Sequence, residues 1–354
     1  MEGLLNARVS IAGHVVAGLA LALAACGRGG APASGHARPD EVALVVGEGV
    51  APAAADILEK ALRREVTYGT PEPLFHVKRV AAADLGRVRR ARSILLLANM
   101  GVPGFVARAA REILSAREAG EAGAGSSAFY LKKDVWGPGQ SVLVVPGQDA
   151  RDVLSLVESR SEKIREALLT ASRERVARDL FRDGEDKNAM NDLAGAVGWS
   201  VRIPMKGWRL DRAREGDGLV RIEGDRPPRA LTVAWAPADS SRLAAEGAFD
   251  HLDAIAARHG RGGAVDRESA SALLGRFAGK SALVTRGVRR GAPGDAGTPF
   301  EAALFLGGAP ERLYVVEREV ARTAEEGGAK VAMWELDAIA ATFQLAGKVH
   351  AAPE

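Results

Sequence analysis

The sequence predicts a protein of the α/β (α+β) class with two domains, an N-terminal domain at 41–182 and a C-terminal domain at 187–348. Three observations predict this. In the first half, short β-branched apolar runs alternate with segments of helical periodicity, which is typical of helices packed on a mixed sheet. In the second half, strand patterns follow one another with few helices between them, as in an antiparallel sheet flanked by helices. A polar segment, RDGED at 182–186, separates the two patterns.

The elements of the first domain follow from the spacing of its apolar residues. Two runs, EVALVVG at 41–47 and SILLLAN at 93–99, are continuous and apolar, as expected of buried strands. Asp149 precedes a long segment with apolar residues at helical spacing and is a suitable N-cap for it. We expect further strands at 74–80, 128–132 and 141–145, helices at 52–64, 82–92, 102–119 and 150–181, and a flexible loop at 120–126.

The second domain contains more strand patterns and fewer helical ones. Alternating apolar residues predict a meander of three antiparallel strands, followed by a helix and then three more strands. The expected strands are 200–203, 219–223 and 230–236 in the first group and 282–288, 301–306 and 312–320 in the second. The expected helices are 188–197, 241–259, a short piece that ends at 277, and a closing helix at 330–346.

The first forty residues predict an export signal, a lipid attachment site and a tether. Residues 15–25 are all apolar or glycine, a stretch of signal-peptide length that is too short to span a bilayer. It ends in Leu23-Ala24-Ala25-Cys26, which resembles the lipobox of bacterial lipoproteins. The resemblance implies that 1–25 is a signal peptide and that Cys26 is lipidated and becomes the new N-terminus. The Gly- and Pro-rich segment 26–40 is then a flexible tether.

Two alternatives to the lipobox remain at this point: a plain signal peptide cut at an Ala-x-Ala-like site, and a signal anchor with an incidental cysteine. Under the lipoprotein interpretation, Gly27 instead of Asp after the cysteine favours the outer membrane. We therefore expect a protein of the cell envelope that faces the periplasm. Its partners would be the membrane, through the lipid anchor, and an unknown envelope protein or ligand.

Composition and motifs predict no catalytic, metal-binding or cofactor-binding residues. The net charge is only +3, and the arginines alternate with acidic residues, so no nucleic-acid partner is expected. Cys26 is the single cysteine, which excludes an intrachain disulfide or a thiolate metal site. The segment GRFAGKS at 275–281 has three residues between its glycines where a phosphate-binding loop has four, so it is interpreted as an ordinary loop. His251 and His259 are too far apart for a helical zinc pair.

Short motifs along the mature chain resemble one bacterial lipoprotein family, known as domain of unknown function 4837. The motifs are Arg38-Pro39-Asp40-Glu41-Val42, Glu72-Pro73-Leu74-Phe75, Asp134-Val135-Trp136 with Gln140, Ile203-Pro204, Gly207-Trp208 and Gly297-Thr298-Pro299-Phe300. The resemblance implies a lipoprotein but no activity and no catalytic residues. Separately, SVRIPMKGW at 200–208 resembles the opening strands of PsbP-like and Mog1-like domains, a fold that hosts mostly non-enzymatic binding proteins.

One turn in the first domain is a candidate partner surface. Trp136 lies in a Gly/Pro-rich turn next to Lys132, Lys133 and Asp134, and loops on rigid scaffolds often carry binding residues. The alternative is that Trp136 only packs over the turn. The leading hypothesis for function is a non-enzymatic binding or assembly module of the envelope. The competing hypothesis is an envelope hydrolase whose carboxylates converge only in the folded chain.

Overall fold

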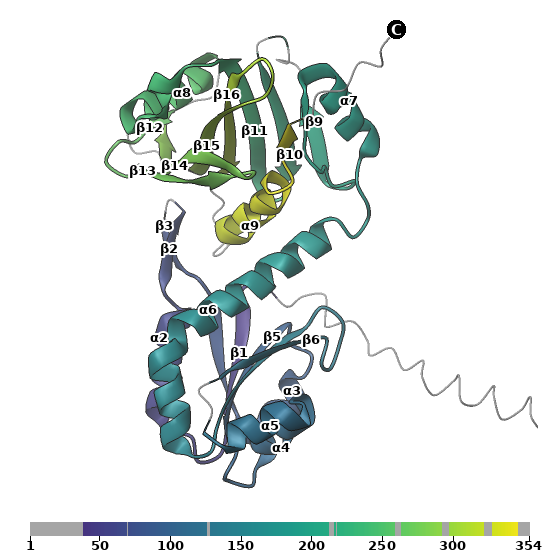
Figure 1. Cartoon of the computed structure of the whole chain (residues 1–354), viewed down its shortest axis with the longest axis vertical. Helices are drawn as coiled ribbons and strands as arrows, with labels where there is room; N and C mark the ends of the chain where they lie inside the picture. The colour runs from purple at the N-terminus through teal and green to yellow at the C-terminus, as the bar shows by residue number, and fades with distance from the viewer. Residues whose placement is uncertain are drawn as a thin grey trace, which may run out of the picture.

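The computed structural model describes residues 38–68, 70–125, 128–211, 216, 218–258, 263–291, 297–321 and 328–345. The predicted signal peptide, the lipobox residues Leu23, Ala24 and Ala25, the lipidation site Cys26 and most of the tether lie outside these residues. The described residues form two main sheets, and the long helix α6 (Ala150–Leu180) runs from the first towards the second (Figure 1).

The first half contains a five-stranded mixed sheet in the order β4-β1-β5-β7-β6. The strands are β1 (Glu41–Val46), β4 (His76–Ala81), β5 (Ser93–Asn99), β6 (Tyr130–Lys133) and β7 (Ser141–Gly147). All neighbours are parallel except β6, which is antiparallel to β7. The mixed sheet with helices confirms the fold class predicted for this half.

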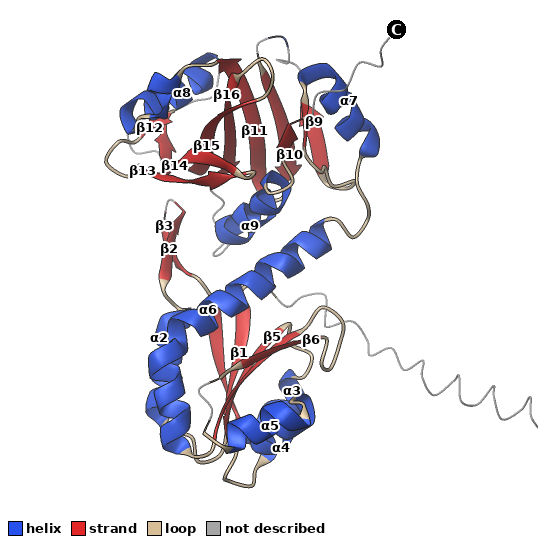
Figure 2. Ribbon diagram, in the orientation of Figure 1, coloured by secondary structure: helices blue, strands red, loops and turns tan. Residues whose placement is uncertain are grey.

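Helices cover both faces of this sheet, which explains why every residue of β5 and β7 is buried (Figure 2). One face packs against α2 and α6, and the other packs against α3, α4 and α5. The bounds are α2 (Pro52–Leu62), α3 (Leu85–Val88), α4 (Phe105–Ile113) and α5 (Ala116–Gly123). Asp149 caps α6 by accepting hydrogen bonds from the backbone N–H groups of Arg151 and Asp152, as predicted.

Two predictions for the first half are wrong in detail. The helix expected at 102–119 is interrupted at Leu114, and the loop expected at 120–126 is helical as far as Gly123. The reason is a capping box: the hydroxyl of Ser115 accepts from the backbone N–H of Glu118, whose carboxylate accepts from the backbone N–H of Ser115. A short hairpin of β2 (Glu65–Tyr68) and β3 (Thr70–Pro73) was not predicted.

The second half contains an eight-stranded antiparallel sheet, in which β13 also pairs with β14 outside the main order β12-β14-β15-β16-β11-β10-β9. This confirms the antiparallel sheet predicted here. The strands are β9 (Trp208–Asp211), β10 (Leu219–Asp225), β11 (Pro228–Pro237), β12 (Ala264–Val265), β13 (Ser271–Phe277), β14 (Lys280–Arg290), β15 (Thr298–Gly307) and β16 (Arg312–Val320). The flanking helices are α7 (Lys187–Val197), α8 (Ala245–Arg258) and α9 (Gly328–Ala340).

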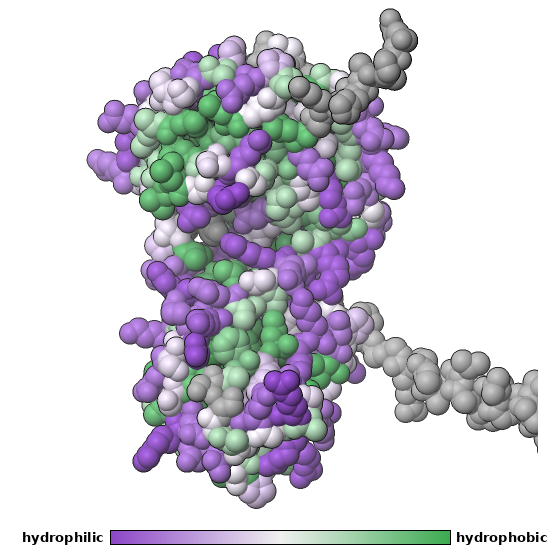
Figure 3. Space-filling view, in the orientation of Figure 1, coloured by the Kyte–Doolittle hydropathy of each residue, from purple (hydrophilic) through white to green (hydrophobic). Residues whose placement is uncertain are grey.

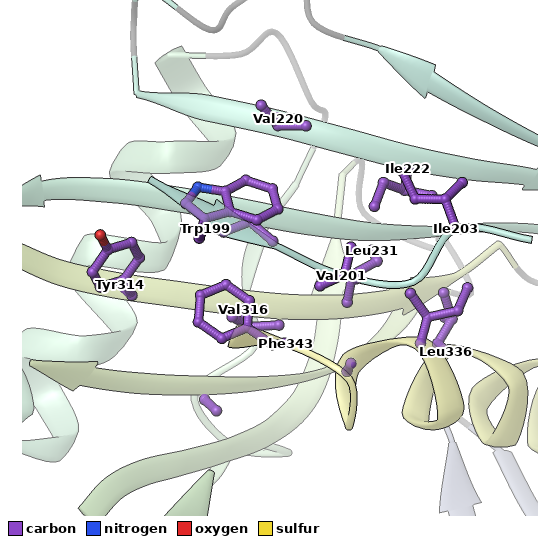
Figure 4. Close-up of a cluster of buried hydrophobic side chains, with 14 of the residues drawn as sticks. Trp199, Val201, Ile203, Val220, Ile222, Leu231, Tyr314, Val316, Leu336 and Phe343 are labelled. Carbon is purple, nitrogen blue, oxygen red and sulfur yellow. The ribbon is translucent and has the colours of Figure 1, made fainter. Parts of the chain in front are cut away.

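The core of the second half explains two further differences from prediction. A strand was expected at 200–203, but the structure has only the short strand β8 (Trp199–Ser200), which pairs with β17 (Gln344–Leu345). Val201 and Ile203 instead pack into the core beside Ile222 and Leu231 (Figure 4). The meander therefore takes β9 as its first strand. The short helical piece expected to end at 277 is the strand β13, because a two-residue turn folds it back along β14.

Among the described residues, none of the helices has both the length and the apolar character that crossing a membrane requires.

Candidate functional site

Helix α9 belongs to the second half of the chain but contributes side chains to the cores of both halves. Met333, Leu336 and Ile339 pack into the core beneath the second sheet. Trp334, which is 1% exposed, points the other way and packs into the core of the first half against Phe75, with 6.4 Å between the ring centroids. The two halves therefore share a hydrophobic contact through one helix.

A fully buried lysine reinforces this contact. The Lys330 ammonium lies 2.8 Å from a carboxylate oxygen of Asp40 and donates to the carbonyl of Pro73, both of which belong to the first half. Burial acts to raise the pKa of Asp40, but Lys330 and Arg38 outweigh it, and the pKa lies below its usual value. Burial raises the pKa of the nearby Glu72, although Lys330 opposes this. Lys330 thus places a positive charge beside the carboxylates of Asp40 and Glu72 at the junction.

Beside the junction lies an open cleft of about 580 Å³, within the usual size range of ligand sites. The first half contributes Pro39 and the end of α6, and the second half contributes Lys206, Trp208, the β10–β11 turn and one face of α9. The charged residues of its lining are Asp179, Asp183, Asp225, Glu335, Lys206, Arg226 and Arg229. Clefts between structural units are preferred positions for binding sites.

An ion pair on an aromatic ring forms one wall of the cleft. Arg229 pairs with Glu335 of α9, and its guanidinium lies over the Trp208 ring, 4.7 Å from the centroid. Burial raises the pKa of Glu335, with Arg229 acting against it, and burial likewise lowers the pKa of Arg229. The ring, the guanidinium and the carboxylate hold one another in place.

The other charged residues of the cleft differ in whether they have an ion-pair partner. Asp179 accepts from Arg92 and Arg182, which outweigh the effect of its burial and lower its pKa. Asp183 pairs with Lys206 at 3.2 Å. By contrast, the exposed Asp225 and Arg226 in the β10–β11 turn make no ion pair with any described residue. Asp225 contributes only a longer-range attraction to Arg229 and Arg209, so one exposed charge of each sign lies at the cleft without an ion-pair partner among the described residues.

The structure brings the four predicted partner-surface residues together at the β6–β7 turn, and each has a partner within the chain. Lys132 pairs with Glu118 at 2.7 Å, and Lys133 pairs with Glu174 at 2.6 Å. Asp134 accepts from the backbone N–H of Gly139. Trp136 is half-buried and packs against the core that α3, α4 and α5 form with one face of the first sheet. The Arg89 guanidinium lies 5.1 Å from the centroid of its ring. Binding at this turn stays a prediction.

Other motifs considered in the sequence have ordinary surroundings. The segment 275–281 is the β13–β14 hairpin, whose turn residues Ala278 and Gly279 both have left-handed backbone angles. His251 is buried on α8, and Arg242 approaches its Nδ1 at 2.7 Å. A search of the described residues finds no group of three or more His, Cys, Asp or Glu side chains that could hold a metal ion.

Sequence reasoning missed the cleft, because its residues come from segments as distant as Pro39 and Glu335. In the sequence, Trp208 is part of the short motifs Gly207-Trp208 and SVRIPMKGW, which do not indicate a cleft. The signal that could have drawn attention to the site is the turn DRPPR at 225–229, which places three charged residues beside a proline pair between two strands.

Comparison with known proteins adds a family match in the first half. Residues 36–181 match the model of a family described as Domain of unknown function (DUF8532). This is a different family from domain of unknown function 4837, so the assignment suggested by the short motifs is wrong. Those motifs are two to five residues long, and such pieces recur in unrelated chains. A search of curated proteins found no match.

Three solved structures have a weak likeness to this chain. A Mog1 mutant is 14% identical, with a TM-score of 0.31 over 43% of this chain and 92% of that one. The Saccharomyces cerevisiae Ran-binding protein Mog1p is 14% identical, with a TM-score of 0.30 over 42% and 90%. A Bacteroides thetaiotaomicron VPI-5482 protein is 12% identical, with a TM-score of 0.26 over 45% and 48%. Scores this low carry no argument, and the fold class rests on the strand pairing described above.

Proposed function

We propose that this chain is a lipid-anchored binding or assembly module of the cell envelope, without enzymatic activity, and that it holds another envelope component in the cleft between its halves. The proposal rests on which charged residues of that cleft are ion-paired and which are not. Three of the four carboxylates among its described lining residues are ion-paired, whereas the exposed Asp225 and Arg226 form no ion pair with a described residue. Such an arrangement favours recognition of a partner with charges of both signs.

The competing hypothesis, an envelope hydrolase, requires a different arrangement. General acid–base catalysis on a water molecule needs a side chain that is within hydrogen-bond reach of the reacting proton and free to take it up. Burial raises the pKa of Glu335 in the cleft, but Arg229 is already paired with this carboxylate. The described cleft lining contains no histidine that could act beside it. These features favour binding over hydrolysis.

The anchoring half of the proposal rests on Leu23-Ala24-Ala25-Cys26 behind an apolar run. Replacing Cys26→Ser should prevent lipid attachment and release the mature part of the chain from membranes. The measurement is membrane fractionation followed by a carbonate wash. A variant that stays on the washed membranes as fully as the natural chain would contradict the anchor.

The cleft is tested by photo-crosslinking in cells. We would replace Arg226 with p-benzoylphenylalanine in the full chain and identify any adduct by mass spectrometry. Lys163, an exposed residue on α6, provides the matched control position. We expect a discrete adduct at 226 and none at 163. Trp208→Ala should weaken that adduct about tenfold, the loss that corresponds to about 1.4 kcal/mol of binding free energy.

Two outcomes would contradict binding in the cleft. One is the absence of any adduct at position 226. The other is the same set of adducts at 226 and 163, which would indicate random collision. Measuring the melting temperature of the Trp208→Ala variant separates loss of binding from loss of folding, because an intact variant melts close to the natural chain.

A further inference from the structure

Within the part of the chain that the structure describes, the strand β13 is an open edge of the second sheet. It pairs on one side with β14, from Ser271 opposite Arg286 to Phe277 opposite Lys280. Five of its seven residues are exposed, and Leu273 and Leu274 are 69% and 88% exposed. Figure 3 shows hydrophobic residues gathered on the side of the second half where α8 and β13 lie. Exposed leucines on an unpaired edge are unusual for a protein that stays alone in solution.

The hairpin geometry determines which backbone groups face outward. A two-residue turn joins Phe277 to Lys280, so these residues form a hydrogen-bonded pair, and such pairs recur at every second residue. The residues between them, Ala272, Leu274 and Arg276, therefore direct their N–H and C=O groups away from β14. This row of outward donors and acceptors is a template for another strand.

The usual protections of an edge strand are missing from β13. It contains no proline and no lysine, and its hydrogen-bonded register with β14 is continuous. Its single charged residue, Arg276, donates to the carbonyl of Gly279 at 2.7 Å, so the guanidinium is directed back to the hairpin turn. Natural proteins normally block such edges with charges, prolines or bulges. An edge left open in this way is suited to strand pairing.

We propose that two copies of this chain associate through β13, in an antiparallel pair whose two-fold axis passes through Leu274. Leu274 is the midpoint of β13, so this register pairs all seven residues and uses every outward backbone group. It places Leu273 opposite Gly275 of the second copy, where the missing side chain leaves room. It also places Arg276 opposite Ala272, so no like charges face each other.

A charge exchange at the axis tests this register. In the proposed pair, Leu274 faces its own counterpart, so Leu274→Lys in both copies places two ammonium groups opposite each other, and Leu274→Glu places two carboxylates there. A mixture of the two variants restores an attractive pair. No other antiparallel register places position 274 opposite its own counterpart.

The experiment uses the full chain with two different affinity tags, co-expressed and extracted in mild detergent. Capture of one tag is followed by quantification of the other. The natural chain should co-purify with itself, and the Lys–Lys and Glu–Glu combinations should lose at least about fivefold of that signal. The Lys–Glu combination should regain it. The same-charge combinations are extracted in the same detergent and carry the same proposed lipid anchor as the natural chain. Their remaining co-purification therefore measures the background that mixed micelles produce.

Met205, which is exposed elsewhere in the second half, provides the matched control. Lys and Glu at position 205 should leave co-purification unchanged. The proposal is overturned if the natural chain does not co-purify above background, which would leave the edge to an extended segment of another protein. It is also overturned if the same-charge variants still co-purify, or if the Lys–Glu mixture does not recover.

Discussion

The two sheets of this protein are buried by different means. The central strands of the first sheet, β5 and β7, contain almost only apolar side chains, and helices cover both of their faces. The second sheet carries charges inside: on β16, Glu317, Arg318 and Glu319 are all less than 10% exposed. The first sheet therefore depends on the amount of apolar surface it buries, whereas the second also depends on specific ion pairs.

This difference indicates where binding features can arise. A sheet covered on both faces by helices offers little surface to a partner, and its parallel strands need those helices as connections. Among the described residues, the antiparallel second sheet leaves the β13 edge open, and Arg229 of its strand β11 pairs with Glu335 of α9 in the cleft. The two candidate surfaces thus lie on the half that is less completely covered, or at its contact with the other half.

The largest expected effect comes from removing the residue that links the two cores. Trp334→Ala should destabilise the protein by about 3–5 kcal/mol, the usual cost of deleting a buried tryptophan. It should also speed proteolysis at 181–186, because the first half loses its contact with α9. Trp199→Ala is the control, since Trp199 is equally buried but lies in the second core.

The measurements are chemical denaturation and limited proteolysis of both variants. Equal acceleration of cleavage at 181–186 in Trp334→Ala and Trp199→Ala would mean that Trp334 has no special role between the halves. A resistant chain with no intermediate fragment in either variant would count against the predicted division into two domains near 182–187.

A somewhat smaller effect tests the buried charges of the second sheet. Glu317 pairs with Arg289 at 2.8 Å, and both side chains are at most 3% exposed. Glu317→Gln should cost about 3 kcal/mol, because it leaves the Arg289 charge buried without its main counter-charge. The double variant Glu317→Met with Arg289→Met should recover part of that loss. If the double variant is less stable than the single one in urea denaturation, the pair itself is a net source of stability.

The last expected effect is smallest near neutral pH: it is a pH dependence of stability that belongs to the second half and grows as the pH falls. Burial, together with Arg242 and Arg258, lowers the pKa of His251 from 6.5 to about 4. Between these two pH values the unfolded chain binds a proton that the folded chain does not. Stability therefore falls as the pH falls from 6.5 towards 4, by at most about 1.4 kcal/mol per pH unit.

His251→Gln should remove this part of the pH dependence and leave the rest. The measurement is the free energy of unfolding in urea at several pH values between 7 and 4. An unchanged slope in the variant would mean that His251 titrates normally in the folded protein.

The candidate site was harder to predict than the fold because it depends on residues that are distant in sequence. The apolar run at 93–99 predicted β5 correctly, and Asp149 predicted the start of α6. By contrast, nothing near Trp208 indicated that Arg229 would lie over its ring, or that Glu335 of a later helix would pair with that arginine. At the β6–β7 turn, sequence identified exposed charges but not the carboxylates of Glu118 and Glu174 that meet them.

The sequence by itself determined the fold class, because strand and helix periodicity are local properties that burial imposes on neighbouring residues. It also contains the lipobox motif on which the proposed anchor rests, since such motifs are recognised as linear segments. Only the tertiary structure decided that β13 is a strand with an open edge, that α9 contributes Trp334 and Lys330 to the first half, and that a cleft lies beside them. The contacts of α9 and the cleft join residues hundreds of positions apart, and no local pattern in the chain specifies which distant partner a side chain will meet. The strand β13 depends instead on its hairpin pairing with β14.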